Sequence, residues 1–461
     1  MDRVNQLLVI TFLFLLLSTN GHAENRQVVL HHDDEGWTLL VDGKPLMVNG
    51  MNWDYFPIGT NYEYVLWEES DEFIQDALDY EMGLLQDIGV NAIRVYTGIT
   101  REWIEYIYDN FGIYTMLNHS FGRYGLLLEG EWVADTDYSD PRVIELLLRE
   151  VTELAMEFRN TRGLLLYLLG NENNYGLFWA GAETEDIPGE DEVSRIRARH
   201  MYRLFNQGAK AVKQIDPYRP VAMANGDTQF LDIIAEEVPD MDIFGSNVYR
   251  GVSFTYLFDQ VKVEYGKPVL LTEFGADAYN ARTEREDQLC QAYYVHGNWR
   301  EIYANAAAMG KAGNSIGGFT FQASDGWWKY GQTYDLNVHN TEATWANQGY
   351  ECDYVEGENN MNEEWFGVMA KGPTDEHGHY ELHPRAAYYV LKEVHTFDPY
   401  ARGATLEALH GFFDRVSLVD AYKQATGRLP KEDYYGIMDE ASGLNVPGYK
   451  QDADPDGKGS R

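Results

Sequence analysis

Residues 163–173 read GLLLYLLGNEN, an uninterrupted apolar run that stops at Gly170 and is followed by Asn171 and Glu172. A second run, residues 268–275, reads PVLLTEFG and reaches Glu273 in the same way. Continuous apolar segments of this length are typical of strands covered on both faces, as in a parallel sheet surrounded by helices. A carboxylate at the C-terminal end of such a strand is poorly explained by packing, so both glutamates are candidates for chemistry.

The rest of the chain repeats this strand pattern in alternation with helical periodicity. The alternation predicts an α/β protein with eight βα units over residues 46–396, which is a single (β/α)8 barrel. An open, doubly wound sheet is the alternative, but it usually has fewer strands, and no glycine-rich nucleotide-binding motif follows any strand. The expected strands are residues 50–53, 91–96, 113–119, 164–169, 220–225, 242–249, 269–272 and 317–322. The expected helices are residues 71–87, 101–109, 141–158, 194–215, 231–237, 256–265, 284–309 and 385–395.

Three further segments are expected outside the repeating units. A β-hairpin with an Asp42-Gly43 turn, residues 37–49, precedes the first barrel strand. An insertion over residues 323–382, rich in acidic, Asn, Gly and Trp residues, follows strand 8 and is expected to shape a cleft at the C-terminal end of the barrel. The barrel domain is thus predicted at 24–400, and residues 401–461 form a C-terminal extension whose end is disordered.

The first 23 residues have the pattern of a secretory signal peptide. Arg3 supplies the positive charge, residues 7–17 are apolar, and Gly21-His22-Ala23 places small residues at a cleavage site. The apolar run is shorter than the ~20 residues that span a bilayer, so a membrane anchor is disfavoured after cleavage. A secreted protein, either periplasmic or extracellular, is expected.

Composition narrows the class of ligand. The net charge of −38 argues against nucleic acid and anionic membranes as partners, and it favours a neutral glycan over a polyanionic one. The 33 Tyr and 11 Trp residues suit either sugar stacking or a large core.

The two cysteines, Cys290 and Cys352, either form one disulfide or remain two free thiols. No motif indicates a metal or an organic cofactor, and the oligomeric state stays open.

The two glutamates fit the chemistry of glycosidic bond cleavage. Cleavage with retention of configuration needs two carboxyl groups about 5–5.5 Å apart, and inversion needs about 6.5–9.5 Å. Strands 4 and 7 lie across a narrow barrel, so Glu172 and Glu273 can face each other over its mouth.

With these residues in view, the chain resembles the retaining β-glycosidases built on (β/α)8 barrels. It is most similar to the catalytic TIM-barrel domain of glycoside hydrolase family 2, over roughly residues 36–396. Asn171-Glu172 and Glu273 carry the specific part of the resemblance. A secondary likeness to β-1,3-glucanosyltransferases rests on residues 91–96, NAIRVY, and on residues 170–172, GNE.

The resemblance implies a role for each matching residue. Glu172 would be the general acid/base and Glu273 the nucleophile. Asn171 would hydrogen-bond the sugar 2-hydroxyl, and Arg94 and Tyr249 would hold the Glu273 carboxylate.

Further residues at the expected strand ends would contact sugar. His119 would line the subsite of the sugar that is cleaved, and Trp327 or Trp328 would form a stacking floor. Asn52 and Trp53 are additional candidates for sugar contacts.

The expected function is that of a secreted retaining β-glycosidase acting on a neutral β-linked polysaccharide or oligosaccharide. A β-glucan is favoured and a mannan is second, because the β-domains that precede a family 2 barrel are not evident between the predicted signal and the hairpin. A β-glucan transglycosylase using the same two glutamates is the first alternative. A non-catalytic carbohydrate-binding barrel is the second, and both glutamates argue against it. A metal-dependent hydrolase would need clustered histidine and aspartate ligands, which His119 alone does not provide.

Overall fold

The computed structural model describes residues 27–96, 98–178, 189, 191–329 and 335–430, and its centre is a parallel β-barrel. Each barrel strand pairs in parallel with its neighbours, and the first and last strands, β4 and β16, pair with each other. The fifth barrel strand consists of two short segments, β10 and β11, and a bridge between Ala222 and Ile243 continues its pairing toward β12. The predicted (β/α)8 barrel is therefore confirmed. In chain order the barrel strands are β4 (Val48–Asn52), β5 (Ala92–Val95), β6 (Tyr114–His119), β9 (Leu164–Leu169), β10 (Val221–Met223), β11 (Asn225–Gly226), β12 (Phe244–Asn247), β13 (Val269–Phe274) and β16 (Ser315–Thr320).

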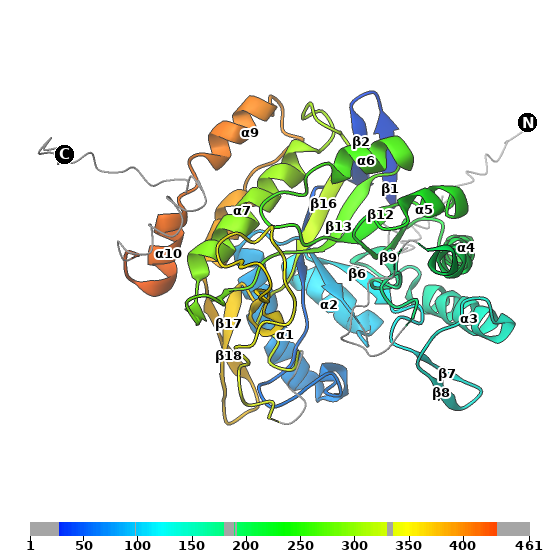
Figure 1. Ribbon diagram of the computed structural model, residues 1–461, viewed down its shortest axis with the longest axis horizontal. Helices are drawn as coiled ribbons and strands as arrows, with labels where there is room; N and C mark the ends of the chain where they lie inside the picture. Colours follow the sequence, from blue (N-terminus) through cyan, green and yellow to red (C-terminus); the bar gives the residue numbers. More distant parts are fainter. Residues whose placement is uncertain (1–26, 97, 179–188, 190, 330–334, 431–461) are drawn as a thin grey trace, which may run out of the picture.

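Helices surround the barrel on the outside (Figure 1). Several begin where a side chain accepts a hydrogen bond from the free amides of the first turn. Ser70, Asp140 and Asp191 do this for α1, α3 and α4, and Pro141 occupies the first turn of α3. The helices between successive barrel strands are α1 (Asp71–Asp87), α2 (Arg101–Phe111), α3 (Pro141–Phe158), α4 (Glu192–Ile215), α5 (Leu231–Glu237), α6 (Leu257–Glu264) and α7 (Gln288–Ala304), with α8 (Ala386–Val394) after the insertion.

Helix α7 is shorter than the sequence predicts. The predicted first residues of this helix form strand β15 (Arg285–Glu286), which pairs with β14 (Tyr279–Asn280). Asp287 then caps the helix by accepting from the Cys290 amide, so the helix starts at Gln288. Cys290, on this first turn, forms a disulfide with Cys352 and so ties the insertion to α7.

The N-terminal hairpin is larger than expected. An additional strand, β1 (Val28–Asp33), pairs with β2 (Gly36–Val41), and only the short β3 (Lys44–Pro45) forms the predicted second arm. The amide of Trp37 donates to the carbonyl of Gly313, just before β16, so this small sheet lies at the N-terminal end of the barrel strands. It covers that end, which leaves the opposite, C-terminal end for a site.

The insertion after β16 contains ordered structure. It includes a 3-10 turn (Glu363–Trp365) and a hairpin of β17 (Met369–Thr374) and β18 (Tyr380–Pro384). Helices α9 (Leu406–Phe413) and α10 (Leu418–Thr426) follow α8, and both pack against α7. None of the helices in the described ranges is long and apolar enough to span a bilayer.

A buried ion pair holds the two ends of the insertion together. Asp325 lies just after β16, and Arg385 lies at the start of α8. The Arg385 guanidinium donates from Nη1 and Nη2 to the two Asp325 carboxylate oxygens, at 2.6 and 2.7 Å, and both side chains are buried. Arg385 Nε also donates to Glu286 Oε1 at 2.7 Å. The long insertion is therefore fixed to the barrel at both its ends.

We expect Arg385→Gln to lower the free energy of unfolding by about 3–5 kcal/mol, because it leaves the Asp325 carboxylate buried without its partner. Lys392→Gln is the matched control on the same helix. Its ion pair with Asp87 is exposed, so its loss should cost less than about 1 kcal/mol. Urea unfolding measures both variants, and equal losses for the two would contradict the account.

Candidate active site

The C-terminal ends of the barrel strands bring a group of polar side chains together. Arg94 lies on β5, Asn118 on β6, Asn247 on β12 and Glu273 on β13. All four side chains are buried, although most side chains of these types are exposed in folded proteins. Parallel strands of a barrel all end at the same face, so residues distant in sequence meet there.

Glu273 is held by three hydrogen-bond donors. Arg94 Nη1 donates to Glu273 Oε1 at 2.8 Å, and the Tyr96 hydroxyl donates to the same oxygen at 2.6 Å. The Tyr249 hydroxyl donates to the other oxygen, Oε2, at 3.0 Å. Three donors on one carboxyl group fix its orientation, and a hydrogen bond from a guanidinium is stronger than one between neutral groups. Arg94 and Tyr249 are thus brought to Glu273, as the resemblance implied.

Arg94 connects Glu273 to the other parts of the site. Its guanidinium is fully buried and donates from Nη2 to Asn171 Oδ1 at 2.8 Å. Its Nε donates to Asn118 Oδ1 at 2.9 Å, and Nη1 also reaches the Thr272 carbonyl at 3.2 Å. Every nitrogen of the guanidinium therefore has a partner, and one cation organises the ends of four strands.

Asn171 is locked in a single orientation by its neighbours. Its side-chain oxygen accepts from Arg94 and from Asn247 Nδ2, the latter at 3.0 Å. Its amide nitrogen donates to the Tyr124 hydroxyl at 2.7 Å. Both ends of the amide are used, so the side chain is held in place before any ligand binds.

Glu172 follows at a sharp turn after β9. Its backbone is in the left-handed region, with a φ of +54°, which is uncommon for a residue other than glycine. Its amide donates to the Ala224 carbonyl at 2.8 Å, and its carbonyl accepts from the Tyr175 amide at 2.9 Å. The turn is therefore anchored on both sides, which fixes where the Glu172 side chain begins.

The charges of Glu172 and Glu273 both raise the pKa values of the same two tyrosines, Tyr249 and Tyr124. Burial raises the pKa of the Tyr249 phenol well above its usual range, and the charges of Glu273 and Glu172 raise it further. Burial also raises the pKa of the Tyr124 phenol, and the same two carboxylates add to this effect. Glu172 and Glu273 thus lie in one electrostatic neighbourhood at the barrel mouth.

Of the other sequence candidates at the ends of β4 and β6, Asn52 joins this group, whereas Trp53 and His119 bond to other residues. Asn52 Oδ1 lies 3.2 Å from the Tyr96 hydroxyl, so Asn52 supports the tyrosine that holds Glu273. Trp53 is a buried core residue whose Nε1 donates to Glu81 Oε2 at 2.6 Å. His119 accepts from the Phe121 amide through Nδ1, and its Nε2 lies 3.4 Å from Glu150. The bonds of Trp53 to Glu81 and of His119 to Phe121 and Glu150 thus lie outside the group around Glu273.

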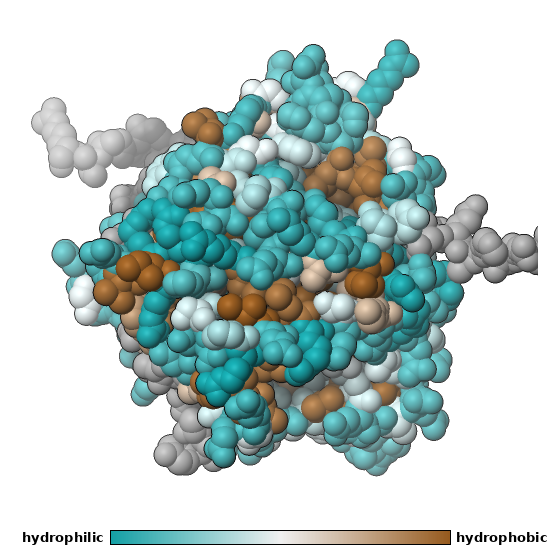
Figure 2. Space-filling view, turned by 90° about the vertical axis from the view of Figure 1, so that its right-hand side faces the viewer, coloured by the Kyte–Doolittle hydropathy of each residue, from teal (hydrophilic) through white to brown (hydrophobic). Residues whose placement is uncertain are grey.

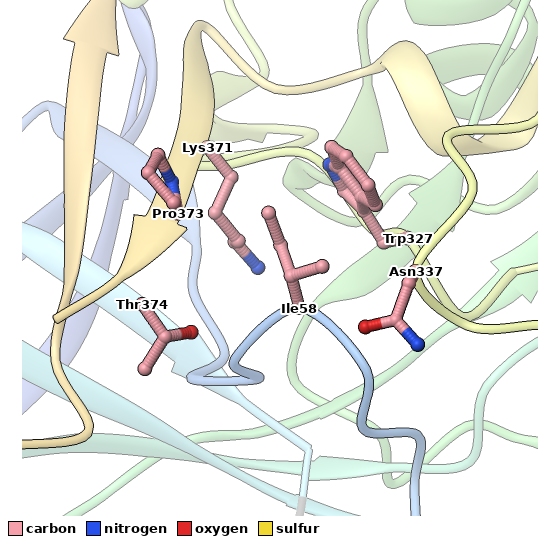
Figure 3. Close-up of a pocket in the computed structure, with 6 residues that line it drawn as sticks. All are labelled: Ile58, Trp327, Asn337, Lys371, Pro373 and Thr374. Carbon is pink, nitrogen blue, oxygen red and sulfur yellow. The ribbon is translucent and has the colours of Figure 1, made fainter. Parts of the chain in front are cut away.

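Trp327 and Trp328 lie in the insertion and make their ring contacts outside the group around Glu273. Trp327 lines a hollow of about 530 Å³ together with five residues from three segments (Figure 3). Its ring stacks on His339, with ring centroids 4.6 Å apart. The Trp328 ring instead contacts Phe56 and Tyr62. The residues that line the hollow are Ile58, Trp327, Asn337, Lys371, Pro373 and Thr374.

Sequence reasoning missed three aromatic residues of the site. Tyr96 lies two positions after Arg94, and alternate residues of a strand share a face, so this spacing could have identified it. Tyr124 lies in the loop after β6, where no periodicity marks it. Phe321 follows β16 directly and contacts the Tyr249 ring, with centroids 6.3 Å apart. Because Phe321 belongs to the apolar run of strand 8, the sequence alone gave it no special signal.

The family model described as glycosyl hydrolases family 2, TIM barrel domain, matches residues 35–343, which is more than half of the chain. The chain belongs to glycosyl hydrolase family 2. This confirms the resemblance drawn from Asn171, Glu172 and Glu273.

Relatives of this family 2 chain share only part of their length with it. A β-galactosidase of Lactococcus lactis is 28% identical over 140 residues, which are 30% of this chain and 12% of that protein. Among solved structures, a β-galacturonidase from Eisenbergiella tayi is 16% identical with a TM-score of 0.50, over 82% of this chain and 55% of that one. A β-D-glucuronidase of Dictyoglomus thermophilum is 17% identical with a TM-score of 0.48, over 81% and 54%. The chain thus spans about half the length of these two structures and 12% of the length of the curated relative. The likeness to the β-galacturonidase shows the fold.

The described residues contain no group of three or more His, Cys, Asp or Glu side chains placed to hold a metal ion. The groups that hydrogen-bond to the Glu273 carboxylate are instead one guanidinium and two phenols.

The raised pKa of Tyr249 predicts that its phenol stays protonated in the folded protein at pH 10, where an ordinary tyrosine is half ionised. Tyrosinate absorbance of folded wild type and of folded Tyr249→Phe should therefore be equal at that pH. In guanidinium chloride every tyrosine is exposed and titrates near pH 10, so a full titration there should end at one tyrosinate fewer in the variant. A lower tyrosinate absorbance of the folded variant at pH 10 would show that Tyr249 titrates normally.

Proposed function

We propose that this family 2 chain is a retaining β-glycosidase that cleaves a neutral β-linked glycan by double displacement. The observation that carries the proposal is the buried Glu273 carboxylate, held by Arg94, Tyr96 and Tyr249 at the end of β13. Glu172, at the end of β9, shares its electrostatic neighbourhood. One carboxylate ready to attack and a second near it are the two groups that retaining hydrolysis requires.

The proposed reaction has two steps. In the first, a Glu273 oxygen forms a bond to the anomeric carbon while the glycosidic bond breaks, and Glu172 gives its proton to the leaving oxygen. In the second, Glu172 takes a proton from water, and that water's oxygen replaces Glu273 on the anomeric carbon. Tyr249 stays neutral because of its raised pKa, so it remains a donor to Glu273 in both steps. Asn171, fixed by Arg94 and Tyr124, is placed to hydrogen-bond a hydroxyl of the reacting sugar.

The substrate class follows from charge and from the aromatic residues at the barrel mouth. The net charge of −38 disfavours a polyanionic glycan, which leaves neutral β-glucan as the first choice and mannan as the second. A sugar hydroxyl in place of water in the second step would make the same site a transglycosylase.

The proposed location of the protein is outside the cytoplasm, after a signal peptide is cleaved behind Ala23. An exported mature chain that does not begin at Glu24 would count against this cleavage site.

The test follows the anomeric configuration of the first product by proton NMR. Wild type should release a β-configured product from a β-linked glucan or mannan oligosaccharide, and β-galactosides, β-glucuronides and β-galacturonides serve as comparison substrates. Glu273→Ala and Glu172→Ala should each lose roughly 10⁴-fold or more of the activity on the oligosaccharide. Glu393→Gln, on the exposed side of α8, is the control and should retain wild-type rates.

Added azide distinguishes the two roles. It can take the place of water in Glu172→Ala and give a β-glycosyl azide, whereas in Glu273→Ala it can attack directly and give the α-glycosyl azide, because a single displacement inverts. An α-configured first product from wild type, or full activity in either alanine variant, would overturn the proposal.

A further inference from the structure

The loop after β6 carries a hairpin whose outer face is apolar. Strands β7 (Leu126–Leu128) and β8 (Glu131–Val133) pair in antiparallel fashion and project from the barrel edge below α3 (Figure 1). Leu126 and Leu128 are buried, whereas Leu127 and Trp132 lie directly opposite each other on the other face, and each is 62% exposed. The side of the molecule that lies to the right in Figure 1 is mostly hydrophilic, with separate hydrophobic patches (Figure 2). Exposing the apolar surface of Leu127 and Trp132 to water costs free energy, and a ligand that covers the pair would recover it.

The indole of Trp132 leans toward the base of the hairpin. Gly125 lies two residues before Leu127, so it shares the exposed face of the ladder and is the diagonal neighbour of Trp132. A Cβ atom at Gly125 would lie 2.6 Å from Trp132 Cζ2, so the ring packs directly against the glycine backbone. The ring therefore lies against Gly125, which follows Tyr124 directly in the chain.

Tyr124 links this face to the active site. Its hydroxyl accepts from Asn171 Nδ2, while 37% of the side chain is exposed. Tyr124, Trp132 and Leu127 thus form an exposed apolar strip, named here the Tyr124–Leu127 strip, that begins at the Asn171 amide and runs outward along the hairpin.

The segments on either side of the strip are held firmly. Thr136 Oγ1 donates to the Gly122 carbonyl at 2.6 Å, and the Tyr138 hydroxyl donates to the Phe121 carbonyl at 3.0 Å. Asn173, in the turn after Glu172, also donates to the Phe121 carbonyl. The loop that carries the strip is thereby bonded at its base to the turn that carries Glu172.

We propose that the Tyr124–Leu127 strip is a stacking platform for the sugar units next to the one that is cleaved, an inference that rests on the proposed function. The C–H faces of a pyranose are apolar and match an exposed indole, while the hydroxyls at the ring edge stay in water. The charged residues within the hairpin are Glu129 and Glu131, which disfavour an anionic lipid surface or a nucleic acid as the occupant. The strip makes this chain an enzyme of extended glycans rather than of short glycosides.

The experiment compares chain lengths. Rates are measured for wild type, Trp132→Ala and Trp132→Phe on 4-nitrophenyl β-glucoside and on β-1,3-linked glucose oligomers of two to seven units, with β-1,4-linked glucose and mannose oligomers in parallel. Trp132→Ala should lose about tenfold in kcat/KM on the longer oligomers, through KM, and nothing on the nitrophenyl glucoside. Trp132→Phe should keep most of the preference. Tyr218→Ala is the control, because Tyr218 is exposed at the opposite end of the barrel, where its carbonyl accepts from the Val28 amide.

Binding separates failure of the platform from failure of the function. In the inactive Glu273→Ala background, calorimetry with the seven-unit oligomer that wild type prefers should show about tenfold weaker affinity when Trp132→Ala is added. Identical chain-length profiles for wild type and Trp132→Ala, or a wild type whose rate does not rise with chain length, would overturn the platform and leave the double displacement standing. A wild type that neither cleaves nor binds any of the oligomers would overturn the proposed substrate class and the platform together.

Discussion

The site depends on one buried cation. Removing a guanidinium from water costs several kcal/mol, and only a full set of partners offsets that cost. Arg94 has such a set, because its nitrogens are shared among the Glu273 carboxylate, the Asn118 and Asn171 side chains and the Thr272 carbonyl. These partners come from different strands, so the cation holds the barrel mouth in one geometry. The same contacts hold the buried Glu273 carboxylate in one orientation at the barrel mouth.

Two other sets of contacts fix the two ends of the barrel. The small sheet of β1, β2 and β3 covers the N-terminal end of the barrel, while the Arg385–Asp325 pair and the Cys290–Cys352 disulfide fix the insertion at the other side. The loop after β6 is bonded through Asn173 to the turn of Glu172. The loops around the mouth are therefore held by specific polar contacts rather than by apolar packing alone.

The barrel and its central carboxylates could be predicted because they depend on local patterns. Apolar runs that end at a glutamate identify β9 and β13, and helical periodicity identifies the helices between them. Arg94 and Tyr249 could be placed at Glu273 through the family resemblance, and Tyr96 could have been added from the strand period. The remaining parts depend on contacts between distant segments. Trp53 resembles a site residue in sequence, but its partner Glu81 lies on α1, and only the packed structure reveals that bond. Tyr124 and Trp132 lie in a loop without periodicity, and the extra strand β1 became visible only through its pairing with β2.

The most direct test of the account is to trap the covalent intermediate. A 2-deoxy-2-fluoro-β-glycosyl fluoride of glucose or mannose has a good leaving group and an electron-withdrawing C2 substituent, so its glycosyl-enzyme should form and then hydrolyse slowly. Mass spectrometry of the intact protein and of its peptides after this treatment measures where the sugar is attached. The account predicts one sugar per chain, bound to the peptide that contains Glu273 and absent when Glu273 is replaced by alanine. A label on any other residue, or continued turnover of a natural oligosaccharide with no trapped enzyme and an inverted product, would contradict it.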